Sequence, residues 1–288
     1  MDNNIYKCNY CGIKFKPKSN YRQHRIQKHY FCSNLCSTMF RFPKVFTKIC
    51  SPFEKPYYWG YFLGALHSDG SIYVKRKVIS FSVIKRTFMD LFLRAIKEIT
   101  GNDYIAKQYK NRNRKNKIWK VNFVNHSLYN ELLKIGNFGK YIWKVPDMVL
   151  NGSREIKRGF LNGFFDGDGY VTKSIYPTVL KRVYFPSIVF SSVNLNGLIG
   201  IGELLSDFNI SFSIKKCFRK LPKTLCYHFY IIKKSEVMSF WEQIGITEES
   251  QKLKFIFEFK NYLHFTKYQH KIKKVELPIG TTEVKEYL

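Results

Sequence analysis

A repeated motif constrains the fold of this chain more than any other feature of its sequence. The segment WGYFLGALHSDGSI (59–72) aligns without a gap to RGFLNGFFDGDGYV (158–171), at an offset of 99 residues. The same patterns follow each copy: alternating β-type runs, an amphipathic helix, a hairpin with basic residues and a closing helix. The sequence therefore predicts a duplicated unit with the element order αββαββα.

Glycines define one face of each predicted motif helix. In each copy two glycines are four residues apart, so on a helix they share a face and remove side chains from it. Two backbones can then approach closely, and we expect the two motif helices to pack together. The predicted helix interface consists of Gly60, Gly64, Gly159 and Gly163.

Each motif ends in Asp-Gly, at Asp69-Gly70 and at Asp168-Gly169. We expect Gly70 and Gly169 to end the helices in a left-handed cap. A carboxylate at the C-terminal end of a helix opposes the helix dipole, and a bound divalent cation would offset that cost. Paired carboxylates that hold Mg²⁺ or Mn²⁺ suit phosphodiester hydrolysis, so Asp69 and Asp168 are candidate catalytic metal ligands. An ordinary Asp-Gly turn is the alternative for a single copy, but two matched copies favour a site.

The two motifs, FLGALHSDG (62–70) and LNGFFDGDG (161–169), resemble the LAGLIDADG motif of homing endonucleases. The resemblance covers residues 56–262 and implies a single-chain α+β enzyme of intron homing, with two pseudo-symmetric αββαββα halves. It implies saddle-shaped antiparallel sheets in the DNA major groove, with metal on the acid before each terminal glycine. An earlier acid of the motif is His67 in the first copy and Asp166 in the second.

The resemblance also implies one basic catalytic residue after the last helix of each half. Lys144, within Trp143-Lys144-Val145-Pro146, matches this position in the first half. Lys252 is the counterpart in the second half, with Lys254 as the alternate.

The basic character of the chain indicates a polyanionic partner. There are 49 Lys and Arg against 21 Asp and Glu, a net charge of +28, and the 45% hydrophobic content excludes a disordered basic tail. We expect binding to double-stranded DNA that weakens steeply with salt. The expected contacts on strands and hairpins are Lys75, Arg76, Lys77, Lys110, Arg112, Arg114, Lys117, Lys181, Arg182, Lys215, Lys216 and Arg219.

The N-terminal segment carries a zinc-ligand pattern that has two solutions. Cys8-x2-Cys11-x12-His24-x4-His29 has the spacing of a C2H2 zinc finger. Cys32 and Cys36 follow at once and can replace the histidine pair in a four-Cys site. Either site would hold Zn²⁺ and fold a module that is too small for an apolar core. The other cysteines, Cys50, Cys217 and Cys226, have no partner by spacing, and we expect them to be structural.

These patterns predict four segments: a zinc module (1–50), a first half (51–150), a second half (151–265) and a basic tail (266–288). The longest apolar run, residues 57–66, is too short to span a membrane. We expect a soluble, intracellular, monomeric and free-standing protein that is neither secreted nor embedded in an intein.

The predicted function is site-specific cleavage of both strands of a long, asymmetric DNA target. Two unequal halves favour an asymmetric target, because a homodimer would read a near-palindrome. The alternatives are a non-cleaving DNA-binding regulator and an intron RNA maturase with the same fold. Retention of Asp69 and Asp168 favours the nuclease, because a pure binder gains little from acids near phosphates.

Overall fold

The computed structural model of the chain describes residues 5–16, 25–26, 29–42, 48–110, 117–136, 138–177, 182–219 and 224–266. Four residues singled out by sequence lie outside these ranges, as does the predicted tail from residue 267 onward. These four are His24, Arg112, Arg114 and Lys181.

The N-terminal module contains short strands and one helix around a small core. Its core consists of Cys8, Phe31 and Cys36, and the Ser33 hydroxyl caps the helix by accepting a hydrogen bond from the Cys36 backbone N–H. The elements are β1 (Tyr6–Lys7), β2 (Lys14–Phe15), β3 (Arg25–Ile26), β4 (His29–Tyr30) and α1 (Asn34–Arg41).

The first half has the predicted αββαββα order, and its four strands form one antiparallel sheet in the order β5-β6-β8-β7. A short 3₁₀ turn, η3 (Val74–Arg76), joins the first two strands. The main elements are α2 (Pro56–Asp69), β5 (Gly70–Tyr73), β6 (Val78–Val83), α3 (Arg86–Thr100), β7 (Lys107–Lys110), β8 (Lys117–Phe123) and α4 (His126–Ile135).

The second half repeats this order, and its antiparallel sheet has the matching strand order β9-β10-β12-β11. The α+β fold of two similar halves is therefore confirmed. Two helices lie outside the repeated units: α5 (Asp147–Leu150) between the halves and α9 (Glu249–Thr266) after them. The sequence predicts the second of these as a final helix over residues 249–262, whereas it gives no signal for α5. The repeated elements are α6 (Arg154–Asp168), β9 (Gly169–Pro177), β10 (Arg182–Ser192), α7 (Leu195–Asp207), β11 (Ser213–Arg219), β12 (Thr224–Ile231) and α8 (Lys234–Gln243).

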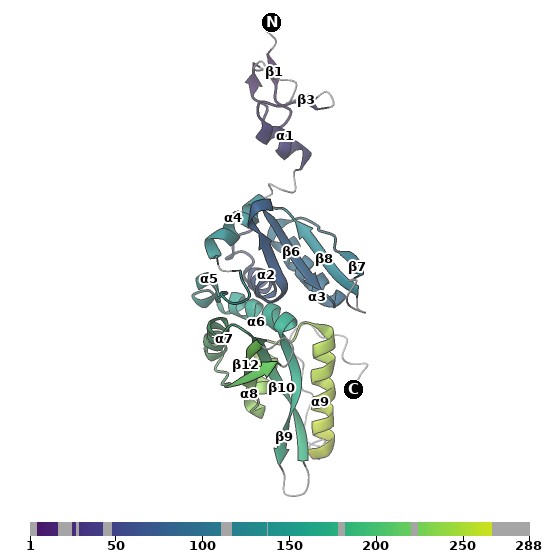
Figure 1. Ribbon diagram of the computed structural model, residues 1–288, viewed down its shortest axis with the longest axis vertical. Coiled ribbons are helices and arrows are strands. Elements are labelled where there is room, and N and C mark those ends of the chain that lie inside the picture. Colours follow the sequence, from purple (N-terminus) through teal and green to yellow (C-terminus); the bar gives the residue numbers. More distant parts are fainter. Residues whose placement is uncertain are drawn as a thin grey trace.

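Helices α2 and α6 lie at the centre of the molecule, with one half on either side of them (Figure 1). A Cβ atom added to Gly60 would lie 2.0 Å from the Ile156 carbonyl oxygen, and one added to Gly64 would lie 2.2 Å from that of Phe160. The contacts are reciprocal, because Gly159 and Gly163 meet the backbone of α2 in the same way. Since contacts advance by one turn along both helices together, α2 and α6 run in the same direction and end side by side.

The expected left-handed caps at the ends of the motif helices are wrong. Gly70 and Gly169 have φ angles of −92° and −98° and extended backbones, so each helix passes directly into the first strand of its half. A Cβ on Gly70 would lie 2.5 Å from the Leu66 carbonyl oxygen, and one on Gly169 would lie 2.6 Å from that of Phe165. Glycine is required here by close contact with the preceding helical turn and not by a positive φ.

A buried polar connection before α9 ties the second half to the first. The Glu248 side chain is only 1% exposed, and its carboxylate accepts hydrogen bonds from Lys85 Nζ at 2.8 Å and Thr87 Oγ1 at 2.9 Å. Lys85 and Thr87 lie at the start of α3 in the first half. Although burial opposes ionisation, the hydrogen bonds of Lys85, Ser250 and Thr87 hold the pKa of Glu248 at about 2.

Candidate active site and metal centres

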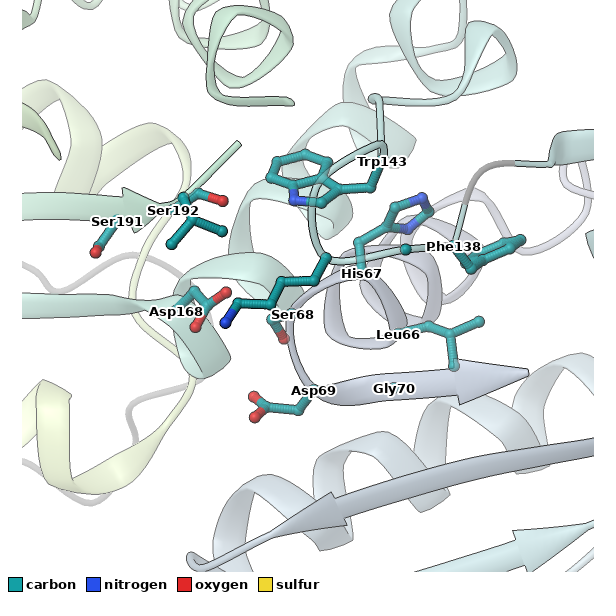
Figure 2. A pocket seen from close by; sticks show the side chains of 13 residues that line it. Leu66, His67, Ser68, Asp69, Gly70, Phe138, Trp143, Asp168, Ser191 and Ser192 are labelled. Carbon is teal, nitrogen blue, oxygen red and sulfur yellow. The ribbon is translucent and has the colours of Figure 1, made fainter. Parts of the chain in front are cut away.

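Asp69 and Asp168 are the last residues of α2 and α6, and both line one cavity of about 320 Å³. Figure 2 shows the two carboxylates facing the same opening, with Ser68 between the ends of the helices. Residues of the α4–α5 connection and of the β10 end complete the wall. The cavity is lined by Leu66, His67, Ser68, Asp69, Gly70, Phe138, Gly139, Lys140, Trp143, Asp168, Ser191, Ser192 and Val193.

The ends of α2 and α6 contact each other directly at this cavity. A Cβ atom on Gly167 would lie 2.1 Å from Ser68 Oγ and 2.5 Å from Asp69 Oδ2. Ser68 and Gly167 occupy equivalent positions of the two motifs, so the serine of one copy packs into the space that the glycine of the other leaves open. The sequence repeat thus brings the first acid to within van der Waals reach of the second helix end.

The electrostatics of Asp69 favour a positive neighbour. Its carboxylate is exposed to the cavity, but protein surrounds it on the other sides, and this desolvation raises the pKa of Asp69 to about 6. The Ser68 hydroxyl partly opposes this rise. Asp168 is also exposed to the cavity. Two carboxylates at adjacent helix C-termini, where the dipoles are negative, form a donor set that fits a hard divalent cation.

The earlier motif position holds different residues in the two copies, and neither side chain joins the acid pair. The His67 ring lies between Phe138 and Trp143, away from Asp69 and Asp168 (Figure 2). Its Nδ1–H donates to the Leu63 carbonyl at 2.7 Å, and burial lowers the pKa of His67 to about 4, so the ring is neutral at pH 7.

Asp166, the counterpart of His67, is a buried structural acceptor. Its carboxylate accepts hydrogen bonds from Tyr61 Oη at 2.6 Å, from the Glu248 backbone N–H at 2.9 Å and from the Thr247 hydroxyl. Burial raises the pKa of Asp166 to about 7, although these hydrogen bonds lower it in part. Asp166 therefore joins α2 of the first half to the segment that precedes α9.

The basic residues near the cavity differ from those that the sequence singled out. Lys140 lines the cavity, whereas Lys144 is exposed and is not among the lining residues. Lys252 is half-buried in the first turns of α9, and Lys254 is exposed on the same helix. Lys140 lacked a sequence signal, because the loop that carries it (138–143) contains no regular element.

The described members of the predicted DNA-binding set lie on strands or on the turns between them. Lys75 and Arg76 form part of η3, and Lys77 follows with a left-handed backbone at φ 52°. All three side chains are exposed. Four further lysines are exposed on strands β7, β8 and β11: Lys110, Lys117, Lys215 and Lys216. Arg182 is the first residue of β10, and Arg219 is the last residue of β11.

Four cysteines of the N-terminal module come together. The sulfur atoms of Cys8, Cys11, Cys32 and Cys36 all lie within 4.8 Å of one another, and the Cys11–Cys32 and Cys32–Cys36 sulfur pairs are each 3.5 Å apart. Tetrahedral zinc with bonds of about 2.3 Å places its sulfur ligands at comparable separations. Burial raises the pKa of Cys8, but hydrogen bonds from the backbone N–H groups of Cys11, Cys32 and Tyr10 outweigh this effect. The pKa of Cys8 is lowered to about 6.

His29 belongs to the alternative C2H2 ligand set and is the histidine of that set that the structure describes. It lies outside this sulfur cluster. The His29 ring packs against Phe40, with 4.7 Å between ring centroids. In the metal-free cluster the hydrogen bond between the Cys32 and Cys36 thiols raises the pKa of Cys32 to about 12. Zinc binding to such a site would therefore release protons from the thiols.

Comparison with known proteins shows which folds this chain resembles. Residues 155–245 match the family described as LAGLIDADG-like domain. The solved structure of the homing endonuclease I-WcaI bound to its DNA recognition sequence superimposes with a TM-score of 0.51. The two chains are 20% identical, and the match covers 78% of this chain and 93% of that one. The N-terminal LAGLIDADG domain of DUF199/WhiA matches with a TM-score of 0.44 and 18% identity, over 69% of this chain and 86% of that one.

A curated protein matches by sequence as well. The DNA-directed RNA polymerase subunit Rpo1C of Methanocaldococcus jannaschii is 28% identical over 197 residues, which is 68% of this chain. The match covers 20% of that subunit, so the chain spans about a fifth of the length of this curated relative. In the part of this chain that the structure describes, no helix is both long and apolar enough to cross a membrane.

Proposed function

From the LAGLIDADG homing endonuclease fold of this chain, we propose that it is a metal-dependent DNA endonuclease that cuts both strands at a long, asymmetric site. The observation that carries the proposal is the meeting of Asp69 and Asp168 at one cavity, at the adjacent ends of two helices in backbone contact. A DNA-binding scaffold alone has no use for two carboxylates near phosphates, whereas a metal-dependent hydrolase requires them.

Asp69 and Asp168 would hold divalent metal, Mg²⁺ or Mn²⁺, at this cavity. The bound metal would supply charge neutralisation at the scissile phosphate and a more acidic attacking water. The residues of the chain contribute the rest. The helix interface fixes the spacing of the two carboxylates, and the strands that follow Gly70 and Gly169 connect each acid to a sheet that holds the DNA.

Three lysines are candidates to stabilise the charge of the reacting phosphate. Lys140 joins Lys144 and Lys252 because it lines the cavity with both acids. Alanine at Lys140 should lower kcat more than alanine at Lys144 or Lys252, since only its side chain is in the cavity wall. An equal loss for all three would assign them a common role in phosphate contact along the DNA.

The two sheets would bind the double-stranded target, each half reading a different half-site as one monomer. Lys75, Arg76 and Lys77 on the η3 turn are well placed to contact phosphates, because all three are exposed and close together. DNA affinity should therefore fall steeply as salt rises, as expected when many cations displace counterions.

Cleavage of a randomised DNA library in Mg²⁺ tests the proposed activity. Wild-type protein should select and cut a long site, while Asp69→Asn and Asp168→Asn should bind that site but cut it at least about 10²-fold more slowly. Asp90→Asn is the matched control, because Asp90 forms only an exposed ion pair with Arg86 on α3, remote from the cavity.

The outcomes distinguish the alternative functions. Tight, selective DNA binding by the wild type without any cleavage would indicate a non-cleaving regulator. Selective binding of intron RNA over duplex DNA, again without cleavage, would indicate a maturase. Either result would contradict the nuclease.

We also propose that Cys8, Cys11, Cys32 and Cys36 hold Zn²⁺ and that the module adds a DNA contact. The support is the convergence of their sulfur atoms. A Cys32→Ser/Cys36→Ser variant should lose its stoichiometric zinc, while a His29→Ala variant should retain it. The reverse result would favour the C2H2 set with His24 and His29.

A further inference from the structure

Two cysteines and a histidine meet on the sheet of the second half, outside the cavity described above. Cys217 on β11 and Cys226 on β12 are direct cross-strand partners. Cys217 Sγ lies 2.6 Å from His228 Nε2, two residues along β12 from Cys226. The Nδ1 atom of His228 lies 3.3 Å from Tyr170 Oη on β9, which fixes the ring from its other side.

The surroundings of Cys217 place a proton acceptor directly beside its thiol. An imidazole nitrogen in hydrogen-bonding contact can take up the thiol proton, which is the arrangement that activates cysteine nucleophiles. Lys215 is the cross-strand partner of His228 and lies on the same sheet face, with its Nζ 5.1 Å from the centre of the Tyr230 ring. The side chain of Cys217 is partly exposed, so a small solute can reach it, whereas Cys226 is fully buried.

The geometry also suits a bond between the two sulfur atoms. Direct cross-strand partners have Cα atoms about 4.5–5.5 Å apart, within the range that a disulfide spans. The Cys226 thiol contacts the Thr224 carbonyl at 3.8 Å, whereas Cys217 leans the other way towards His228. The thiols therefore lean apart while reduced, and rotation about the two χ1 angles brings them together without a change in strand pairing.

We propose that Cys217 is a peroxide-reactive cysteine and that Cys226 resolves it as a cross-strand disulfide. The Cys217 thiolate attacks one oxygen of H₂O₂, the O–O bond breaks, and the departing hydroxide takes the proton held by His228 to leave as water. The Cys226 sulfur then attacks the resulting Cys217 sulfenic acid. A second water leaves, so that two thiols and one peroxide give one disulfide and two waters.

The site is specific to the second half. Matching the strand registers of the two sheets places Tyr109 and Ile118 at the positions of Cys217 and Cys226, and Lys120 at the position of His228. The first half therefore cannot form this bond. Oxidation would affect one sheet of the pair and leave the other unchanged.

Peptide mass spectrometry of the full-length, zinc-loaded protein after a short exposure to H₂O₂ tests the proposal. We expect a Cys217–Cys226 linkage that a dithiol reverses, formed at least about tenfold faster than oxidation of the partly exposed Cys50. Oxidation of Cys217 no faster than that of Cys50, or linkage of Cys217 to another cysteine, would overturn it. This measurement needs no variant and does not depend on folding of a mutant.

Two variants separate the chemical steps. In Cys226→Ser the reaction should stop at the Cys217 sulfenic acid, which dimedone traps, and in His228→Gln the oxidation of Cys217 should slow by about tenfold. Unchanged kinetics in a folded His228→Gln protein would reject the activating role of the imidazole. A Tyr230→Phe variant is the control, because it keeps the ring beneath Lys215.

A link to nucleic acid rests on the proposed function. Cys217 shares a sheet face with Lys215, a proposed DNA contact, so a random-sequence DNA duplex at low salt should slow the oxidation of Cys217 but not that of Cys50. A disulfide that forms equally fast with DNA would contradict DNA binding on this face while leaving the redox site intact. A missing disulfide would reject the redox site alone.

Discussion

The two halves share a backbone design but carry different chemistry at equivalent positions. Both have the same strand order, and the glycine pairs Gly60/Gly64 and Gly159/Gly163 meet the backbone of the opposite helix at nearly equal distances. Asp69 and Asp168 end the two helices at matched positions. The residue two places earlier, in contrast, is a neutral, aromatic-packed histidine in one half and a buried carboxylate in the other.

The difference follows from what each position contacts. The interface glycines and the last acids face the pseudo-symmetric partner, so the two copies meet the same requirement. His67 faces the α4–α5 connection, and Asp166 faces the segment before α9, which has no counterpart in the first half. The glycine positions, which meet only the opposite motif helix, stay alike. His67 and Asp166 also contact the opposite helix, but each has a further neighbour particular to its own half, and these two positions diverge.

The strongest test of this likeness is to add a methyl group to each half of the interface. Gly64→Ala and Gly163→Ala should each lower the free energy of unfolding by at least about 3 kcal/mol, because the new Cβ would overlap backbone atoms that cannot move aside. Urea denaturation measures the effect. Gly101→Ala is the control, with open space around it and a cost of about 1 kcal/mol from its positive φ. A small loss in the free energy of unfolding for only one of the two variants would contradict the equivalence of the two halves.

The next test uses the position where the halves differ. Asp166→Ala should cost about 3 kcal/mol, because it leaves buried donors of Tyr61 and Glu248 without an acceptor. His67→Phe should change stability by less than about 1 kcal/mol, since the ring keeps its aromatic neighbours and loses one hydrogen bond. Chemical denaturation of both variants decides, and equal losses would contradict the different roles.

A smaller effect is expected at the connection between the halves. Glu248→Gln should cost about 2 kcal/mol at pH 7, because the amide no longer pairs with the Lys85 ammonium group. The folded-state pKa of Glu248, about 2, is below its ordinary value of 4.5. The stabilisation is therefore complete above pH 4.5 and is lost as the pH falls through 2. The difference between wild type and variant should shrink over this window, and a constant difference would exclude an ionic cause.

The smallest expected effect concerns Asp69 in the absence of metal. Its pKa is raised from 3.8 to about 6, so the folded protein binds this proton more tightly and loses stability as the pH rises between these values. At pH 7, Asp69→Asn should melt roughly 2 °C higher than the metal-free wild type, after allowance for solvent screening. Mn²⁺ should raise the Tm of the wild type but not of the variant. The same measurement on Asp168→Asn shows whether the two acids share one metal.

The repeat was sufficient to predict the order of elements in each half, while the two antiparallel sheets were implied by the resemblance to homing endonucleases. The glycine spacing, the alternating β-type runs and the amphipathic helices recur at a constant offset, and local patterns of this kind determine element type and order. The caps at Gly70 and Gly169 were mispredicted, because Asp-Gly is typical of a left-handed turn and the clash with Leu66 or Phe165 depends on how the strand leaves the helix.

Features that depend on contacts between distant segments were beyond sequence reasoning. The Glu248–Lys85 pair joins residues 163 positions apart, and Lys140 reaches the cavity from a loop without periodicity. Cys217 and Cys226 looked unpaired by spacing, because only the register of β11 against β12 makes them neighbours.

The extended glycines at the ends of the motif helices have a consequence for how such a chain can diversify. Gly70 and Gly169 leave no further residue between each proposed metal-binding acid and the first strand of its sheet. If DNA lies on the sheets, the distance from the bases they read to the bond they cut is set by covalent continuity. Substitutions along the strands can then change which sequence is recognised, while the cut stays at a constant position within it.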